Sequence, residues 1–193
     1  MLSLLNNYKK TLATSATVLL VLIVGFTKLR ISVYEGLWPF FQWMDGTWFG
    51  VAGKNWGALF ALVEAFHLLA LAMLGGAVFV SNGRLLGILL TNRPAETVVK
   101  QMHNLLIWAL VIILASGIFM VCGLATRVYY LPVFWFKMLA LGVGLLFEFF
   151  IRHPLLQNNI EVIKPWIVRA VAIASIMIWT TVAATGRWIG YAG

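Results

Sequence analysis

Hydrophobic residues along this chain come in long runs that short polar or basic stretches separate. An α-helix needs about 20 mostly apolar residues to cross a bilayer, and these runs have about that length. Backbone amide and carbonyl groups inside hydrocarbon must pair within their own segment, which favours helices over open strands. The pattern therefore predicts five transmembrane helices, at about residues 11–27, 56–80, 104–124, 132–151 and 165–185.

The composition supports this class, because 62% of the 193 residues are hydrophobic and only 10% are charged. Soluble domains have a much larger charged share. The five runs and their connections leave no room for a soluble domain, so we expect one all-α integral membrane domain over residues 1–193. The first run follows Lys9 and Lys10 and lacks a small-residue cleavage site, which favours a retained anchor over a removed signal peptide.

The net charge of +8 is typical of loops that meet anionic lipid head groups, so the lipid bilayer is the expected partner and nucleic acid is not. If the N-terminus is cytoplasmic, eight of the 14 Lys and Arg residues lie on the cytoplasmic side. Because cytoplasmic loops carry the excess of positive charge, this count favours a cytoplasmic N-terminus. We expect a multi-pass membrane protein.

The longest connection between helices is rich in aromatic residues, which gather at membrane interfaces. Its segment 37–50 is predicted to form one short helix or a pair of helices on the outer leaflet, entered at Trp38-Pro39 and broken at Gly46 and Gly50. Two roles stay open for it. It is an aromatic belt that anchors the bundle, or it covers a cofactor or a docking surface.

Residues 81–101 form a basic turn between the second and third predicted helices. Asn92-Arg93-Pro94, followed by Glu96, is typical of a helix start, so the third helix is expected to begin in the interface before its membrane part. Arg84 lies at the inner end of the second helix. Its side chain is expected to reach the interface, bind a lipid phosphate or pair with a haem propionate.

Glu64 and His67 lie inside the second apolar run, where ionisable groups are costly and usually face the bundle interior. Their spacing predicts that both lie on one helix face. Glu64 is a candidate for orienting a histidine or for moving protons to or from a quinone. A di-metal carboxylate site needs a second Glu-x-x-His and more acids, which this chain lacks.

Three histidines, His67, His103 and His153, are candidate ligands of haem b, because imidazole is a common axial ligand of haem iron. His103 and His153 lie at equal chain distances from Val128 in the turn between helices three and four. They should therefore reach the same level of the bundle, while His67 should lie on the order of 20 Å away from it. Two interpretations stay open: two histidines clamp one haem, or all three are satisfied core or interfacial side chains. Met120 and Met177 are the other ligands considered for His67.

Several motifs resemble an uncharacterised family of small five-helix bacterial inner-membrane proteins. The resemblance covers about residues 47–153 and is carried by the segments 63–71, 75–76, 83–87, 116–119 and 134–137 and by His153. That family is distantly similar to copper-resistance D and cytochrome b561 membrane domains, which implies a helical bundle able to hold haem b. Where relatives usually have an acid before the Arg-Leu-Leu-Gly run, this chain has Asn82-Gly83, and it lacks the four axial histidines of a di-haem cytochrome b561.

These features predict a b-type cytochrome-like subunit that passes electrons between a quinone pool and a partner protein. Histidines would hold the iron, Arg84 would meet a propionate and Glu64 would orient a ligand or move protons. The first alternative is a haem-free accessory subunit that scaffolds a larger complex with membrane or periplasmic proteins. The second is a transporter or metal-handling protein, to which Cys122 and the scattered methionines point. These features favour an electron-transfer or accessory subunit over a stand-alone enzyme, and no catalytic residue is expected.

Overall fold

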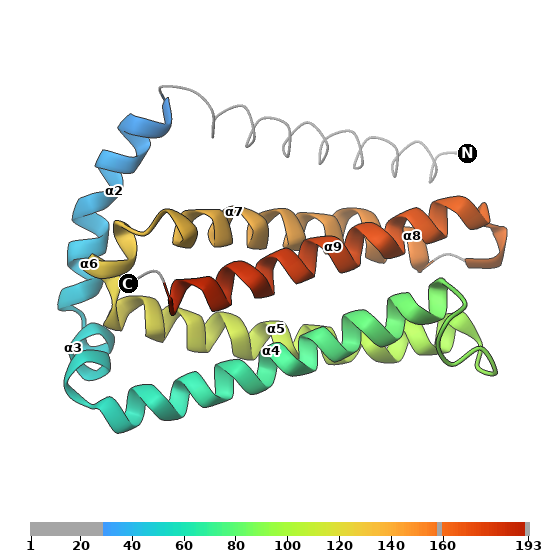
Figure 1. Ribbon diagram of the computed structural model, residues 1–193, viewed down its shortest axis with the longest axis horizontal. Helices are drawn as coiled ribbons and strands as arrows, with labels where there is room; N and C mark the ends of the chain where they lie inside the picture. The colour runs from blue at the N-terminus through green and yellow to red at the C-terminus, as the bar shows by residue number, and fades with distance from the viewer. Residues whose placement is uncertain (1–28, 158–159, 192–193) are drawn as a thin grey trace.

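The computed structural model describes residues 29–157 and 160–191 (Figure 1). Within these residues every regular element is a helix. The predicted span at 11–27 lies outside the described residues and stays a prediction. The all-helical class is therefore confirmed, and the fifth span is not tested.

Four helical segments are long and apolar enough to cross a membrane. They are α4 (Gly57–Leu85), α5 (Ala95–Gly123), the continuous segment Pro132–Leu156 and α9 (Pro165–Ile189). At about 1.5 Å per residue, α4 and α5 are each about 43 Å long, which matches a bilayer with its head groups at about 40–45 Å. These helices lie alongside one another in a bundle (Figure 1). Four predicted spans are thus found as helices, and they are longer than expected.

The segment Pro132–Leu156 is not uniform. It consists of α7 (Pro132–Leu146), a π-helical stretch η1 (Phe147–Arg152) and α8 (His153–Leu156). π-Helical turns are rare and occur frequently at functional sites, because the wider turn re-aims the side chains that follow it. A short 3-10 turn, η2 (Ile160–Val162), then leads into α9.

The connection between α4 and α5 begins with a defined helix end. Gly87 has a φ of 77°, its amide donates to the carbonyl of Arg84 at 3.1 Å, and the amide of Ile88 donates to Gly83 at 2.9 Å. This pair of hydrogen bonds around a left-handed glycine is a Schellman motif. Helix α5 then starts at Ala95, before its membrane part, as the Asn92-Arg93-Pro94 pattern predicts.

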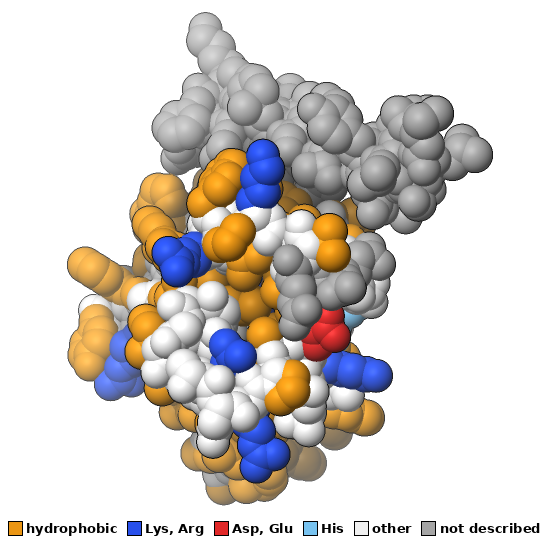
Figure 2. All heavy atoms as spheres, turned by 90° about the vertical axis from the view of Figure 1, so that its right-hand side faces the viewer, with side chains coloured by type: hydrophobic (Ala, Val, Ile, Leu, Met, Phe, Trp, Pro, Cys, Tyr) orange, Lys and Arg blue, Asp and Glu red, His pale blue; other side chains and the backbone are white. Residues whose placement is uncertain are grey.

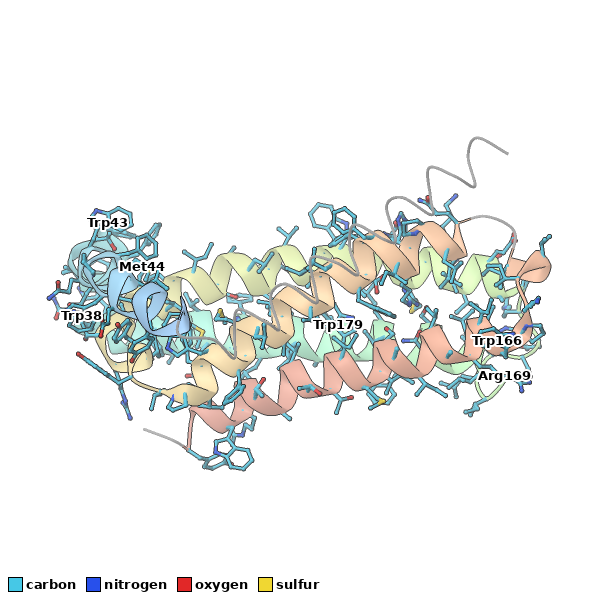
Figure 3. All side chains as sticks on the ribbon, turned by 90° about the horizontal axis from the view of Figure 1, so that it is seen from above. Trp38, Trp43, Met44, Trp166, Arg169 and Trp179 are labelled. Carbon is cyan, nitrogen blue, oxygen red and sulfur yellow. The ribbon has the colours of Figure 1, made fainter. Side chains whose placement is uncertain are left out.

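The aromatic segment forms two helices, α2 (Leu29–Gly46) and α3 (Trp48–Asn55), which lie across one end of the bundle (Figures 1 and 3). The expected pair is present, but two of its predicted bounds are wrong. Pro39 lies inside α2, and Gly50 lies inside α3 rather than at a break. The break falls at Thr47, whose hydroxyl accepts the Gly50 amide at 3.2 Å and caps α3.

Aromatic side chains fasten α2 to the bundle. Tyr34 and Tyr129, the last residue of the short helix α6 (Ala125–Tyr129), stack with ring centroids 4.5 Å apart. Each hydroxyl donates to the other residue's carbonyl, at 3.1 and 2.6 Å. Phe41 packs edge to face on Tyr129 and Phe134. A separate apolar core, built around Leu74, Leu110 and Trp179, fills the middle of the bundle.

Candidate functional site

A buried polar cluster lies at the end of the bundle opposite to α2. We call it the polar centre, and it consists of Ser81, Asn82, His103, Glu148, Arg152, His153 and Ser175. Three of these residues, Glu148, Asn82 and Ser175, are each 0% exposed, and Arg152 is 2% exposed. Burial of so many polar groups between membrane-length helices is costly and is typical of functional sites.

Glu148 and Arg152 form the ionic core of this cluster. They lie one turn apart on the π-helical stretch η1, and Arg152 Nη1 donates to Glu148 Oε1 at 2.8 Å. The other two nitrogen atoms of the guanidinium group bond to α4. Nη2 donates to the hydroxyl of Ser81, and Nε donates to Asn82 Oδ1 at 3.3 Å. The Arg152 guanidinium therefore joins α4 to η1 through three partners.

The cluster also reaches α9. Asn82 Nδ2 donates to the hydroxyl of Ser175 at 3.0 Å. Asn82 thus uses its amide oxygen for Arg152 and its amide nitrogen for Ser175, which fixes the orientation of the amide. An acid at position 82 would keep the first bond, and the second would need the Ser175 hydroxyl to donate, because a carboxylate only accepts.

His103 and His153 meet beside Glu148. Their imidazole rings stack with centroids 3.8 Å apart and planes 15° apart, so the prediction that they share one level is confirmed. His103 Nδ1 lies 3.4 Å from Glu148 Oε1. His153 Nε2 lies 3.0 Å from Nε2 of the exposed Gln157. The two rings therefore lie between the surface of the protein and the buried carboxylate.

Two polar atoms of this centre lack a hydrogen-bond partner among the described residues: His103 Nδ1 and Glu148 Oε2. A buried polar atom without a partner costs about 1–3 kcal/mol. The centre is thus incompletely satisfied at the histidine and the carboxylate, the two groups that can gain or lose a proton. This is the arrangement that allows the cluster to accept a proton or a donor from outside.

His67 lies far from the polar centre, on the same helix as Ser81 but about 20 Å along its axis. Its Nδ1 lies 2.8 Å from the Ser116 hydroxyl, which itself donates to the carbonyl of Ile112. Since the hydroxyl hydrogen is used there, Nδ1 of a neutral His67 must carry the hydrogen and donate to Ser116. Its Nε2 is then a free acceptor.

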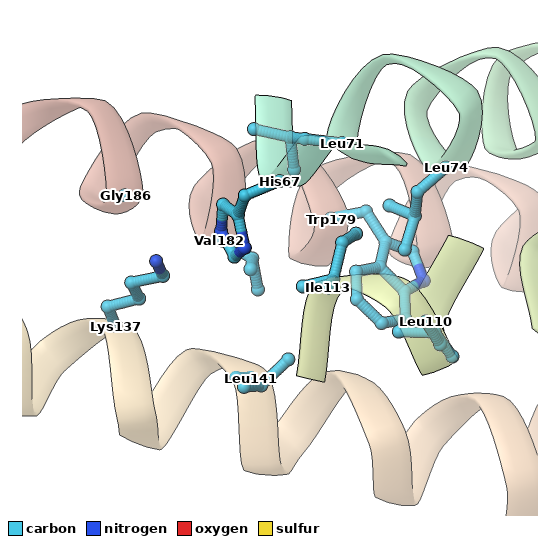
Figure 4. A pocket seen from close by; sticks show the side chains of 10 residues that line it. All are labelled: His67, Leu71, Leu74, Leu110, Ile113, Lys137, Leu141, Trp179, Val182 and Gly186. Carbon is cyan, nitrogen blue, oxygen red and sulfur yellow. The ribbon is translucent and has the colours of Figure 1, made fainter. Parts of the chain in front are cut away.

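His67 and Lys137 line the same pocket in the bundle (Figure 4). The pocket has a volume of about 30 Å³, and its other walls are mostly apolar, with Leu71, Leu141 and Trp179 among them. Such a space holds about two water molecules. Lys137 makes no hydrogen bond or ion pair with the described residues, and it was not singled out from the sequence because it lies near the start of an apolar run.

Glu64 and His67 do not form the expected pair. Glu64 lies exposed on the outside of α4, while His67 is 8% exposed and packs against α5. Residues at i and i+3 differ by about 60° around a helix axis. On α4 this angle separates the exposed face, which carries Glu64, from the face that packs against α5, which carries His67. Arg84 also lies outside the polar centre: its Nε donates to the carbonyl of Arg93 at 2.8 Å.

As they lie here, the histidines do not fit a haem. The rings of His103 and His153 are in face-to-face contact, so a macrocycle between them would require the rings to separate. The pocket at His67 is far smaller than a haem, and neither Met120 nor Met177 lines it. Among the described residues no group of three or more His, Cys, Asp and Glu side chains is placed to hold a metal ion.

Comparison with known proteins places this arrangement in a family. A family model described as a family of unknown function, DUF6644, matches residues 40–192, which is most of the chain. The chain belongs to this family. The match includes every residue of the polar centre and the His67 pocket. No curated protein and no solved structure matches the chain. The resemblance to an uncharacterised family agrees with this match, and the match shows no link to copper-resistance D or cytochrome b561 domains.

Proposed function

We propose that this protein is a haem-independent membrane subunit that takes up and releases protons at the polar centre. The observation that carries the proposal is the position of Glu148. It is fully buried in a helix of membrane-spanning length, and one of its oxygens faces both Arg152 and His103. Intramembrane carboxylates and histidines that face a bundle interior commonly form proton relays.

Charge balance explains how the centre could hold a proton. Ionised Glu148 and Arg152 cancel each other, which removes most of the cost of burying either charge. A proton that arrives on His103 adds one positive charge, and the carboxylate oxygen at 3.4 Å stabilises it. The cluster therefore has two charge states that differ by one proton and share one hydrogen-bonded frame.

A purely structural role explains less of the geometry. Replacing a buried ion pair with packed apolar residues is often neutral or stabilising, so an ion pair is a poor device for stability alone. A structural network would also use all of its polar atoms in hydrogen bonds, whereas His103 Nδ1 and Glu148 Oε2 have no hydrogen-bond partner among the described residues. The stacked histidines lie between the exposed Gln157 and these atoms.

The test uses purified protein in liposomes that enclose a pH-sensitive dye, with a potassium diffusion potential as the driving force. We expect proton entry that Glu148→Gln and His103→Gln abolish, because the first removes the carboxylate that stabilises the proton and the second removes the imidazole that accepts it. Glu64→Gln is the matched control, because it removes a carboxylate of the same helical bundle that lies outside the polar centre. Equal proton entry in Glu148→Gln and the unaltered protein would refute the proposal.

Infrared spectroscopy separates loss of proton binding from loss of fold. Between acid and alkaline pH, a protonated carboxyl or imidazolium band that is absent in the substituted proteins identifies the group that titrates. Helix content and thermal unfolding are measured on the same samples. If the variants stay folded and the bands do not change, the centre does not bind protons.

A second candidate is an electron-transfer subunit with haem b, as the distant resemblance to copper-resistance D and cytochrome b561 domains implies. Its support is that His103 and His153 converge from α5 and α8 at one level, although their contact leaves no space for a haem between the rings. The haem would require the two rings to separate, and a quinone pool would supply or accept the electrons. Oxidised and dithionite-reduced spectra of protein made with haem supplied test this candidate. Absence of reduced α and Soret bands would leave the haem-free accessory subunit.

We place this function in the bacterial inner membrane, with the polar centre on the cytoplasmic side. The support is charge: Arg84, Arg93, Lys100, Lys164 and Arg169 lie at the end of the bundle that carries the polar centre. An excess of Lys and Arg marks cytoplasmic loops. Cysteine accessibility at Thr91, in the loop between α4 and α5, tests this orientation in whole cells.

A further inference from the structure

The ends of α4 and α9 enclose a second pocket, separate from both the polar centre and the His67 pocket. Its volume is about 250 Å³, and its walls come from residues 84–87 at the α4 end, from Ile160 and Ile163, and from Pro165, Val168 and Arg169 at the α9 start. The pocket therefore lies where two membrane-length helices end, at the level of the membrane interface.

Among the described side chains, the charged groups that line this pocket are Arg84 and Arg169. The Arg84 side chain is oriented by a hydrogen bond, because its Nε donates to the carbonyl of Arg93 at 2.8 Å. Its two terminal nitrogens stay available for a ligand. The Arg169 side chain is exposed and makes no hydrogen bond with the described residues. Among the described side chains, no carboxylate lines the pocket.

The remaining walls are apolar. Leu85, Ile163 and Val168 line the pocket beside the two guanidinium groups, and Val168 is 7% exposed. A free phosphate would gain nothing from these walls. A phospholipid matches both parts, since its phosphate can meet the arginines while its glycerol and upper acyl chains contact the apolar side chains.

Trp166 indicates the depth of the pocket. It lies on α9 between Pro165 and Arg169 and is 68% exposed, at the same end of the bundle as Arg169 (Figure 3). Tryptophan on the outside of a membrane helix collects at the level of the lipid head groups. The view onto this end shows Lys and Arg side chains spread around apolar ones (Figure 2).

We propose that this pocket binds the phosphate group of an anionic phospholipid, with Arg84 and Arg169 as its two ligands. Helix α4 ends in the Schellman motif at Gly87. This motif fixes the backbone of residues 84–87, which form one wall of the pocket. The site is independent of proton uptake at the polar centre, because none of its wall residues belongs to that cluster.

Native mass spectrometry of the full-length protein, after removal of its own lipids, tests this site with added phosphatidylglycerol or phosphatidylcholine. We expect retention of phosphatidylglycerol over phosphatidylcholine. Each arginine near an anionic head group contributes about 1 kcal/mol, which is about fivefold in affinity. Arg169→Gln should therefore weaken binding about fivefold, and the double variant with Arg84→Gln about thirtyfold.

Arg127→Gln is the matched control, because Arg127 is an exposed arginine at the opposite end of the bundle and should leave binding unchanged. Arg84→Gln also removes a bond to the α4–α5 loop, so Arg169→Gln, which removes no such bond, decides the result if the double variant is unstable. Inorganic phosphate or glycerophosphate that competes as well as the lipid would reassign the pocket to a soluble phosphate. Equal retention of both lipids, or equal loss in Arg127→Gln, would overturn the site.

Discussion

The imidazole rings of His103 and His153 lie face to face, with centroids 3.8 Å apart, although they come from α5 and α8. One ring borders the buried carboxylate of Glu148, and the other reaches the exposed Gln157. This stack is the link between the polar centre and its surroundings, so substitutions at its outer ring should separate packing from chemistry.

His153→Phe should keep the stack, whereas His153→Ala should remove it. An aromatic pair contributes about 0.5–1.5 kcal/mol beyond its buried area, so the alanine variant should be less stable by at least that amount. Both variants should lose proton entry in liposomes, because neither side chain titrates. Unfolding by sodium dodecyl sulfate in mixed micelles measures the stability. Full proton entry in the phenylalanine variant would show that His153 only packs.

Glu148 and Arg152 should behave as a coupled pair. Arg152→Met alone leaves a buried carboxylate without its cation, and breaking a buried pair in this way costs about 3–5 kcal/mol. The double variant with Glu148→Gln should lose much less than the sum of the two single variants, since neither charge remains. A double-mutant cycle on the unfolding free energy checks this. Additive losses would mean that the two side chains do not interact.

Asn82→Asp should change the polar centre without breaking it. The new carboxylate still accepts from Arg152 Nε, but it cannot donate to Ser175, and it places a second negative charge near Glu148. Two carboxylates that share one arginine should hold a proton between them. We expect an additional carboxylic acid band in the infrared spectrum at neutral pH. Asn82→Ala, which loses both bonds, is the control and should show no such band.

Gly53 and Gly123 allow α3 and α5 to touch through their backbones. A Cβ atom added at Gly53 would lie 2.9 Å from the Gly123 Cα, too close for the helices to keep their places. Gly53→Ala should therefore destabilise the protein by about 1–3 kcal/mol. Gly76→Ala on α4 is the control, because its Cβ would meet nothing within 4 Å and alanine favours the helix by about 0.5–1 kcal/mol. Thermal unfolding in detergent compares them, and equal melting temperatures would contradict the close contact.

We expect the positive charge of Lys137 to lower the stability of the folded protein. It lines a largely apolar pocket beside His67, where an ammonium is costly. Lys137→Met has a similar length and no charge, so we expect it to raise the unfolding free energy by about 1–3 kcal/mol. Lys137→Arg keeps the charge and should not. Destabilisation by the methionine variant would show that Lys137 has a structural partner.

The sequence alone determined what depends on local composition and on the fixed rise of a helix. Apolar runs long enough to span a bilayer form α4, α5, Pro132–Leu156 and α9, because hydrocarbon selects for long apolar helices whatever their neighbours. The shared level of His103 and His153 also followed from the sequence, since equal chain lengths from one turn give equal depth in antiparallel helices.

Only the tertiary structure decided how each helix is rotated. Rotation is set by packing against neighbouring helices, and in a helix that is apolar all round the sequence carries little trace of it. This is why Glu64, expected beside His67, lies on the outside of α4, while Glu148 and Arg152 turn inward to meet Asn82 and Ser175. Hydrophobicity fixed the depth of each ionisable group, and packing fixed which groups meet.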